Sequence, residues 1–152
     1  MPDKDRKMSI VFLSDLMATE KLAQKIAPHL SKGDVLALSG ELGTGKTEFA
    51  RALLRALGMT GDVPSPTFTL MQSYDINGLL ISHFDLYRLK SSDELDELGW
   101  DDALADGVVL VEWPERAGKR VPPENLSLHF TLAAGGTRKC AIDAPEKWAT
   151  LL

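Results

Sequence analysis

The sequence contains the stretch DVLALSGELGTGKTEFARALLRAL, residues 34–57. It begins with a short apolar run, which predicts a buried strand, and ends in an amphipathic run that Gly58 closes, which predicts a helix. Between them, GELGTGKT (Gly40–Thr47) satisfies the pattern G-x-x-x-x-G-K-[S/T] without substitution. Strand, glycine-rich loop and helix in this order are typical of a P-loop, and they place the chain among α/β proteins.

The residue types in this loop suit a nucleotide triphosphate. Glycines let backbone N–H groups turn toward phosphate oxygens, and the helix N-terminus adds a partial positive charge. Lys46 can reach the β- and γ-phosphates, and the Thr47 hydroxyl can bind Mg²⁺. The alternative is a glycine-rich turn that begins a helix with Lys46 in solvent. Guanine-binding P-loop proteins usually carry Asn-Lys-x-Asp, which this chain lacks, so ATP is favoured.

Composition limits the remaining possibilities. The 152 residues fit one domain, 1–152, with residues 1–7 as a loose polar leader. The net charge of −5 argues against a protein that grips nucleic acid by itself. The start of the chain is charged, and Cys140 is the single cysteine. A cytoplasmic protein without a membrane span is therefore expected, with Cys140 as a buried, inert thiol.

The remaining pattern predicts a mixed sheet flanked by helices. Strands are expected at 9–13, 34–39 and 107–112, and antiparallel hairpins at 68–85, turning at Asn77-Gly78, and at 126–143. A helix is expected from an N-cap at Ser14 to about residue 30, and an acidic helix at 92–98. Pro145 is expected at the first position of a closing helix.

Two apolar runs end on an acid, Asp85 and Glu112. In open α/β sheets ligands collect at the carboxyl ends of strands, so one acid is expected to hold Mg²⁺ and the other to orient or deprotonate water. The alternative for each is an exposed acid at a strand end. Thr67 lies in a Pro-bounded loop and suits a switch-like sensor of the γ-phosphate, or an ordinary turn. Arg88 is a candidate for stabilising transition-state charge or for an ion pair.

Other signals are weaker. His29 and His83 lack metal-ligand spacing and are interpreted as structural. Residues 91–106 carry seven acids and no base, which fits a solvated helix face or a docking surface for a basic partner. Trp113 is expected at a partner interface before the nucleotide.

The segments GELGTGKT, SPTFTL, HFDLYRL, DELDELGWDD and VEWPER occur in this order across residues 9–116. Together they resemble the TsaE (YjeE) family, small P-loop ATPases required for threonylcarbamoyladenosine modification of bacterial tRNA. The resemblance implies that Thr47 and Glu112 bind Mg²⁺, that Asp85 is needed for hydrolysis and that Thr67 lies in a switch-like loop. The residues implied to bind ATP or ADP are Leu16, Thr19, Glu41, Leu42, Gly43, Thr44, Gly45, Lys46, Thr47 and Glu115.

The resemblance also implies slow ATP hydrolysis that partner subunits stimulate. The partners are a TsaD-like transferase and its TsaB-like companion, so contact with tRNA is indirect and the chain does not perform the transfer. Glu48 departs from the family, which more often has Thr or Ser there. Two alternatives stay open: a small-molecule kinase, which would need a basic lid, and a nucleotide-dependent binding module without hydrolysis.

Overall fold

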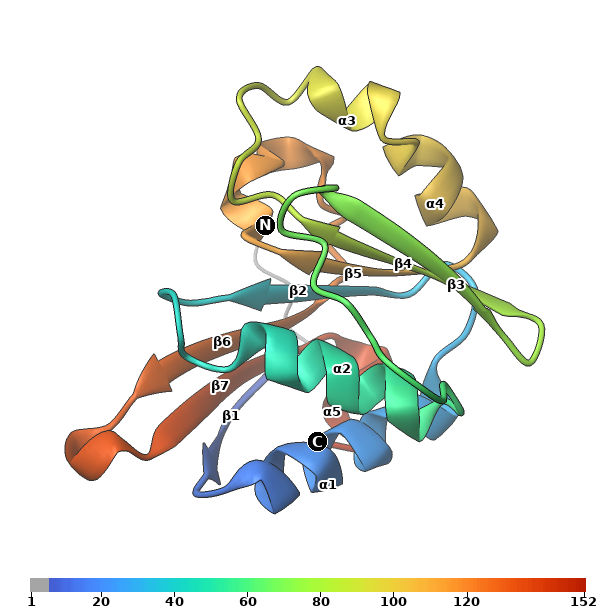
Figure 1. The fold of residues 1–152 in the computed structure, drawn as a ribbon. Coiled ribbons are helices and arrows are strands. Elements are labelled where there is room, and N and C mark those ends of the chain that lie inside the picture. The colour runs from blue at the N-terminus through green and yellow to red at the C-terminus, as the bar shows by residue number, and fades with distance from the viewer. Residues whose placement is uncertain (1–5) are drawn as a thin grey trace.

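The computed structural model describes residues 6–152, which form one seven-stranded sheet with helices on both faces (Figure 1). The strand order is β1-β7-β6-β2-β5-β4-β3. The strands are β1 (Lys7–Leu13), β2 (Val35–Ser39), β3 (Met71–Ile76), β4 (Leu79–Asp85), β5 (Val108–Glu112), β6 (Leu126–Leu132) and β7 (Arg138–Ala144). The α-helices are α1 (Leu16–Ile26), α2 (Lys46–Ala56), α3 (Glu94–Glu97), α4 (Trp100–Asp106) and α5 (Glu146–Ala149). Short 3-10 helices cover Ala27–His29, Pro114–Arg116, Gly118–Arg120 and Ala134–Gly136.

The centre of the sheet is parallel and its edges are antiparallel. β2 pairs in parallel with both β5 and β6, and β5 pairs in parallel with β4. The hairpins β3–β4 and β6–β7 and the pair β1–β7 are antiparallel. β5 is buried along its whole length, as expected for an aliphatic strand covered on both faces. The predicted mixed α/β sheet with two added hairpins is confirmed.

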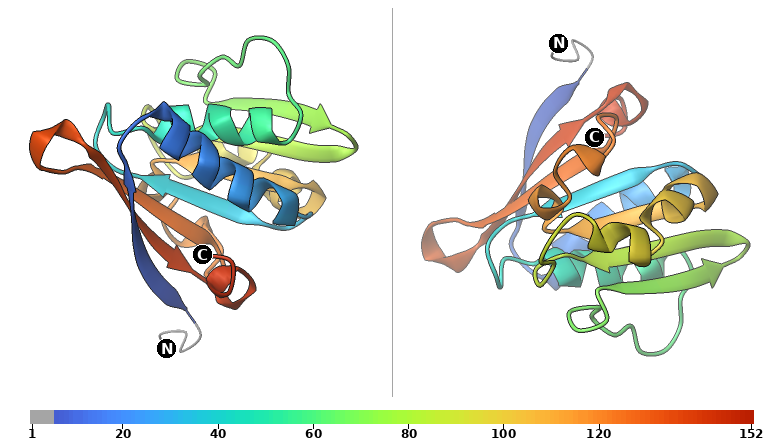
Figure 2. Two further views of the ribbon diagram at one scale, coloured as in Figure 1. Left: turned by 90° about the horizontal axis from the view of Figure 1, so that it is seen from below. Right: turned by 90° about the horizontal axis from the view of Figure 1, so that it is seen from above.

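Side chains that alternate along β2 divide the core into two layers. Leu36 and Leu38 pack with α1 and α2 on one face, whereas Val35 and Ala37 pack with α3 and α4 on the other. The two views of Figure 2 show these helix pairs on opposite sides of the sheet. Within residues 6–152, no helix is both long and apolar enough to cross a membrane.

The turn between β3 and β4 follows its sequence signal. Asn77 and Gly78 both have positive φ, 54° and 87°, as a type I′ turn requires. This turn fixes the β3–β4 register and thereby the position at which β4 ends, Asp85.

Three predicted boundaries at the N-terminal end were wrong. Residues 1–5 of the predicted leader lie outside the described residues, but Lys7 begins β1 and Arg6 donates to Asp143 Oδ1 at 2.7 Å. The N-cap is Asp15, not Ser14, because the Asp15 carboxylate accepts the Ala18 N–H at 2.9 Å. The α-helix ends at Ile26 because Pro28 has no N–H to continue the ladder.

The acidic segment also differs from its prediction. Gly99, with φ of 77°, separates two short helices, and Trp100 of the second is fully buried. Arg120 donates to Asp96 at 2.6 Å and to Asp101 at 3.2 Å, so a distant arginine pairs with part of the acidic charge. Pro145 is the N-cap of the closing helix rather than its first residue.

Candidate functional site

The site lies where β2, β4 and β5 end at one edge of the sheet. These three strands are parallel, so their carboxyl ends meet there, and the loop Gly40–Gly45 follows β2 directly. Asp85 and Glu112 are register partners on neighbouring strands, and Leu38 is the partner of Glu112 on β2. The sequence could place both acids at strand ends but not beside each other, since strand order is not encoded in local pattern.

The loop needs glycine for two different reasons. Gly40 has φ of 133°, and a Cβ there would lie 2.3 Å from the Phe130 carbonyl oxygen, so only glycine fits against β6. Gly45, with φ of 114°, is the N-cap of α2, and the Arg138 side chain lies across it. The loop backbone therefore lies against β6 at Gly40 and against the Arg138 side chain at Gly45.

Lys46 is buried beneath this loop. Its ammonium donates to the carbonyl oxygens of Gly40 and Glu41, the latter at 3.0 Å, and lies 4.1 Å from the centroid of the Trp113 ring. Burial lowers the pKa of Lys46 below its ordinary value, while the carboxylates of Glu112 and Asp85 act in the opposite direction. Two loop carbonyls and the face of an aromatic ring therefore hold the ammonium beneath the loop.

Glu112 has a partner on each oxygen. Oε1 accepts the Thr47 hydroxyl at 2.8 Å, and Oε2 lies 2.7 Å from His83 Nε2. The side chains of His83 and Glu112 are only 1% and 2% exposed, so Glu112 ends β5 as predicted but is not the exposed acid of the alternative. The predicted pair of Thr47 and Glu112 is brought together by the fold.

Asp85 is held by the chain on either side of it. Oδ1 accepts the Tyr87 N–H at 3.1 Å, and Oδ2 accepts the Thr67 hydroxyl at 3.2 Å. Burial raises the pKa of the Asp85 carboxyl, and the two hydrogen bonds offset part of this effect, whereas the nearby charge of Glu112 adds to it. A carboxylate in this setting accepts a proton more readily than one in water.

A cavity of about 240 Å³ opens between the loop and the two acids. The predicted site residues that line it are Leu42, Gly43, Gly45, Lys46, Thr47, Thr67, Asp85 and Glu112. Glu41, Thr44 and Glu115 line a neighbouring cavity of about 500 Å³, on the β6 side of the loop. Eight of the predicted residues are therefore together, and these three lie beside them.

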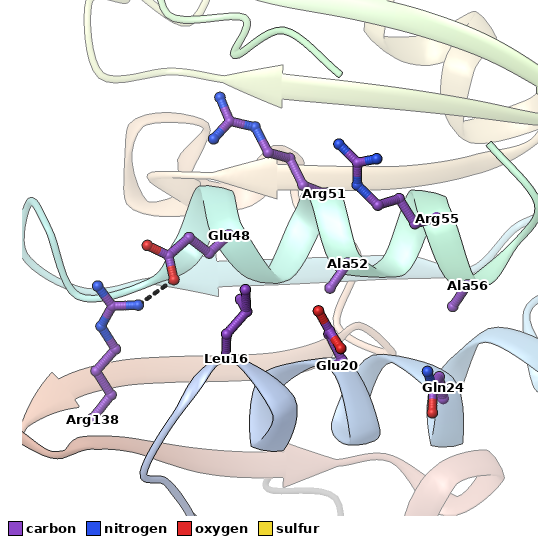
Figure 3. A pocket seen from close by; sticks show the side chains of 9 residues that line it. All are labelled: Leu16, Glu20, Gln24, Glu48, Arg51, Ala52, Arg55, Ala56 and Arg138. Atoms are coloured by element: carbon purple, nitrogen blue, oxygen red, sulfur yellow. Dashed lines mark hydrogen bonds and ion pairs between the residues drawn. The ribbon is translucent and has the colours of Figure 1, made fainter. Parts of the chain in front are cut away.

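A larger cavity of about 730 Å³ runs between α1 and α2 (Figure 3). Leu16 lies at the start of α1 beside it, whereas Thr19 is 3% exposed and is not part of the lining. Arg138 forms an ion pair with Glu48 at the end of this cavity nearest the phosphate loop. Arg138 and Glu48 line both the larger and the smaller cavity, so they stand where the two meet.

Sequence reasoning missed several residues of the site. His83 was interpreted as structural, yet it contacts Glu112, and Trp113 was expected at a partner interface, yet its ring lies against Lys46. Arg138 was not considered, because it comes from a hairpin distant in sequence. The one local signal was alternation, which places His83 on the same face of β4 as Asp85.

Two predicted side chains lie elsewhere. Arg88 lies over the Phe68 ring, 4.7 Å from its centroid, and does not line the 240 Å³ cavity. Cys140 is fully buried, as predicted, and burial raises the pKa of its thiol to about 12, which disfavours the reactive thiolate.

The donor set at Thr47 and Glu112 fits Mg²⁺. Among residues 6–152 there is no cluster of three His, Cys, Asp or Glu side chains that could hold a metal by themselves. Mg²⁺ is usually bound by one or two protein oxygens, with phosphate and water oxygens as the remaining ligands. One hydroxyl and one carboxylate beside a phosphate loop match this requirement.

The sequence matches the family model described as threonylcarbamoyl adenosine biosynthesis protein TsaE over residues 13–140. The tRNA threonylcarbamoyladenosine biosynthesis protein TsaE of Rickettsia felis is 36% identical over 144 residues, covering 94% of this chain and 84% of the relative. The protein of the same name from Bacillus subtilis is 37% identical over 127 residues, covering 83% and 79%. The crystal structure of Bacillus subtilis YdiB aligns with a TM-score of 0.79 at 30% identity, covering 96% of this chain and 92% of that one.

Proposed function

Because this chain belongs to the TsaE family and therefore to tRNA threonylcarbamoyladenosine biosynthesis, we propose that it is the subunit that binds and hydrolyses Mg·ATP for that modification. The observation that carries the proposal is the contact between the Thr47 hydroxyl and Glu112 Oε1 at 2.8 Å, beside the phosphate loop. A loop hydroxyl and a strand-end carboxylate at this distance are the two protein ligands that a P-loop ATPase supplies to Mg²⁺.

The surroundings of the two acids support different roles for them. His83 contacts Glu112 Oε2, and Oε1 lies beside the hydroxyl of Thr47, the other proposed ligand, so Glu112 is suited to hold the metal. One Asp85 oxygen is occupied by the hydroxyl of Thr67, a residue of an irregular loop, so a movement of that loop frees it. We assign Asp85 to orienting the attacking water and accepting its proton.

The other residues of the site bind the nucleotide. Lys46 exchanges its loop carbonyl acceptors for β- and γ-phosphate oxygens. When bound, Mg²⁺ neutralises charge that develops on the phosphates. The cavity beside Leu16 continues from the phosphate cavity through Arg138 and Glu48, and its size suits the nucleoside part of ATP.

The proposed partners are a TsaD-like transferase and its TsaB-like companion, because membership in this pathway implies other subunits. The chain would then use ATP turnover to reset or gate that complex, and it would contact tRNA only through it. The small-molecule kinase is disfavoured, because the segment that would form a lid carries acids rather than bases. This segment forms α3 and α4, which pack on the face of the sheet opposite to α1 and α2.

The test is phosphate release from Mg·ATP by the purified protein, alone and with TsaD- and TsaB-like subunits. Slow release that the subunits accelerate supports the proposal, and phosphate transfer to a metabolite would replace it with the kinase. Asp85→Asn should keep ATP affinity within about twofold and lower turnover by about 100-fold, the range of a lost general base. Lys46→Ala should weaken ATP binding itself, by about 1.5–3 kcal/mol for lost charged hydrogen bonds. Wild-type turnover in Asp85→Asn would remove Asp85 from the mechanism.

A further inference from the structure

His83 occupies a position where packing alone favours an apolar side chain. It lies on the face of β4 that α1 and α2 cover, two residues after Ile81, which is fully buried in that core layer. Its register partner on β5 is the fully buried Leu110. Among the described residues, His83 Nδ1 has no hydrogen-bond partner although it is buried. A buried polar atom without a partner costs about 1–3 kcal/mol, so the reason for a histidine here lies in what its other ring nitrogen contacts.

Within residues 6–152, the one polar contact of the His83 ring is made to Glu112. His83 Nε2 lies 2.7 Å from Glu112 Oε2, and a carboxylate oxygen can only accept, so Nε2–H is the donor. This bond takes Oε2 and leaves Oε1 directed at the Thr47 hydroxyl, 2.8 Å away. The carboxylate is therefore held between two donors on opposite sides, and its plane is fixed.

The neighbouring acid shows why this constraint matters. Asp85 is the register partner of Glu112, and both carboxylates lie at the same edge of the sheet, close enough for the charge of one to raise the pKa of the other. Without the His83 bond, repulsion from Asp85 and the freedom of a glutamate side chain would let Glu112 adopt other rotamers.

We propose that His83 is a positioning residue, which holds Glu112 Oε2 through Nε2–H so that Oε1 is presented, together with the Thr47 hydroxyl, to the magnesium ion of the bound nucleotide. The inference rests on the proposed function, because it assumes that Glu112 is a metal ligand. Groups that hydrogen-bond to metal ligands commonly change metal affinity by about 10–100-fold when removed.

The test compares amides of two lengths at position 83. The amide nitrogen of His83→Gln can reach the place of Nε2 and donate to Glu112, whereas that of His83→Asn stops near the place of Nδ1 and cannot. His83→Leu removes the donor altogether. Phe84→Leu is the matched control, because Phe84 is equally buried on the same strand but packs on the opposite face, 4.9 Å from the Trp100 ring. Thermal melting of each variant identifies those that fold.

The measurement is calorimetric ADP affinity in Mg²⁺ and in EDTA, which does not depend on turnover. The gain from Mg²⁺ is the factor by which Mg²⁺ raises ADP affinity over that in EDTA. We expect His83→Gln and Phe84→Leu to keep this gain within about twofold of wild type. His83→Asn and His83→Leu should reduce it by about tenfold or more. Affinity in EDTA should stay within about twofold for all. A wild-type gain in folded His83→Asn or His83→Leu overturns the proposal, and so does a lost gain in folded His83→Gln.

Glu112→Gln distinguishes this proposal from the proposed function. If Glu112→Gln loses the Mg²⁺ gain while His83→Leu or His83→Asn keeps it, Glu112 is a metal ligand and His83 does not position it. If Glu112→Gln keeps the full gain, Glu112 is not a ligand, and the metal site and the role of His83 are overturned together.

Discussion

The Thr67 hydroxyl donates to Asp85 Oδ2 at 3.2 Å, and the same hydroxyl lies 2.8 Å from Ser65 Oγ. This contact joins the irregular loop of residues 63–70 to the acid that we assign to the attacking water. Val63 holds the start of this loop in the core, whereas Phe68, one residue after Thr67, is 81% exposed. The position of the loop and the availability of Asp85 are therefore linked.

Thr67→Ala should lower the affinity for ATP and leave the affinity for ADP unchanged. If Thr67 leaves Asp85 to contact the γ-phosphate or its metal, its hydroxyl contributes to ATP binding and not to ADP binding. We expect ATP affinity to fall by about tenfold, one hydrogen bond of about 1.4 kcal/mol, while ADP affinity is unchanged. Thr67→Ser is the control that keeps the hydroxyl. An equal loss for both nucleotides would show that Thr67 only shapes the loop.

Asp85→Asn should stabilise the nucleotide-free protein at neutral pH. Burial raises the pKa of Asp85, so the ionised carboxylate opposes folding above its folded-state pKa, and this penalty disappears as pH falls below the unfolded value. Asparagine keeps an acceptor for Tyr87 N–H without the charge. We expect Tm to rise by a few degrees at pH 7–8 in EDTA, with the difference shrinking toward pH 4.

Asp75→Asn, melted in EDTA over the same pH range, is the control for the stabilisation expected of Asp85→Asn. Asp75 is exposed and caps the β3–β4 turn by accepting the Gly78 N–H, so its replacement should not give a gain that disappears in acid. A gain for Asp85→Asn that is constant between pH 4 and pH 8 would point to packing rather than to the buried charge.

Arg138 and Glu48 should have opposite effects on ATP binding. Their ion pair lies where the phosphate cavity meets the larger cavity, so Glu48 competes with phosphate for the arginine. Arg138→Ala should weaken ATP binding by about tenfold, typical of a lost charge-assisted hydrogen bond, and Glu48→Gln should strengthen it slightly. Affinities at two salt concentrations measure this, because the arginine contribution should fall with salt. Weaker binding in Glu48→Gln would mean that the acid is needed to orient Arg138.

Trp113 should report nucleotide binding through its fluorescence. Trp100 and Trp148 are buried, whereas the Trp113 ring lies half-buried beneath the Lys46 ammonium and 5.0 Å from the Tyr87 ring. Moving Lys46 toward phosphate removes a cation from the ring face. We expect ATP to change the tryptophan emission, and Trp113→Phe to abolish that change while ATP still binds by calorimetry. A change that persists in Trp113→Phe would come from the buried tryptophans.

The sequence predicts the parts of this site that are local. The phosphate loop, the strands that carry Asp85 and Glu112, and the Asn77-Gly78 turn all follow from patterns a few residues long, and the structure contains them. The apolar stripe predicts a first helix longer than the observed one, because Pro28 ends it. The acidic helix predicted at 92–98 is shorter in the structure, and the pattern does not predict the second helix that follows Gly99.

Contacts between distant residues could not be predicted in the same way. His83 and Glu112 meet because β4 and β5 pair in one register, and Arg138 reaches Gly45 because β7 belongs to the same sheet. Neither relationship leaves a periodic signal in the chain. Trp113, with φ of 59°, adopts a backbone conformation that no local preference of tryptophan would suggest.

The register between β4 and β5 also makes the site a sensor of complete folding. Asp85 and Glu112 lie side by side only after β5 has entered the sheet between β2 and β4, a step that joins segments far apart in the chain. A partly folded molecule that has formed the phosphate loop would still lack the second carboxylate and its histidine. If the proposed function holds, tight Mg²⁺-dependent nucleotide binding would mark molecules that have finished folding, and nucleotide in the cell would favour them by mass action.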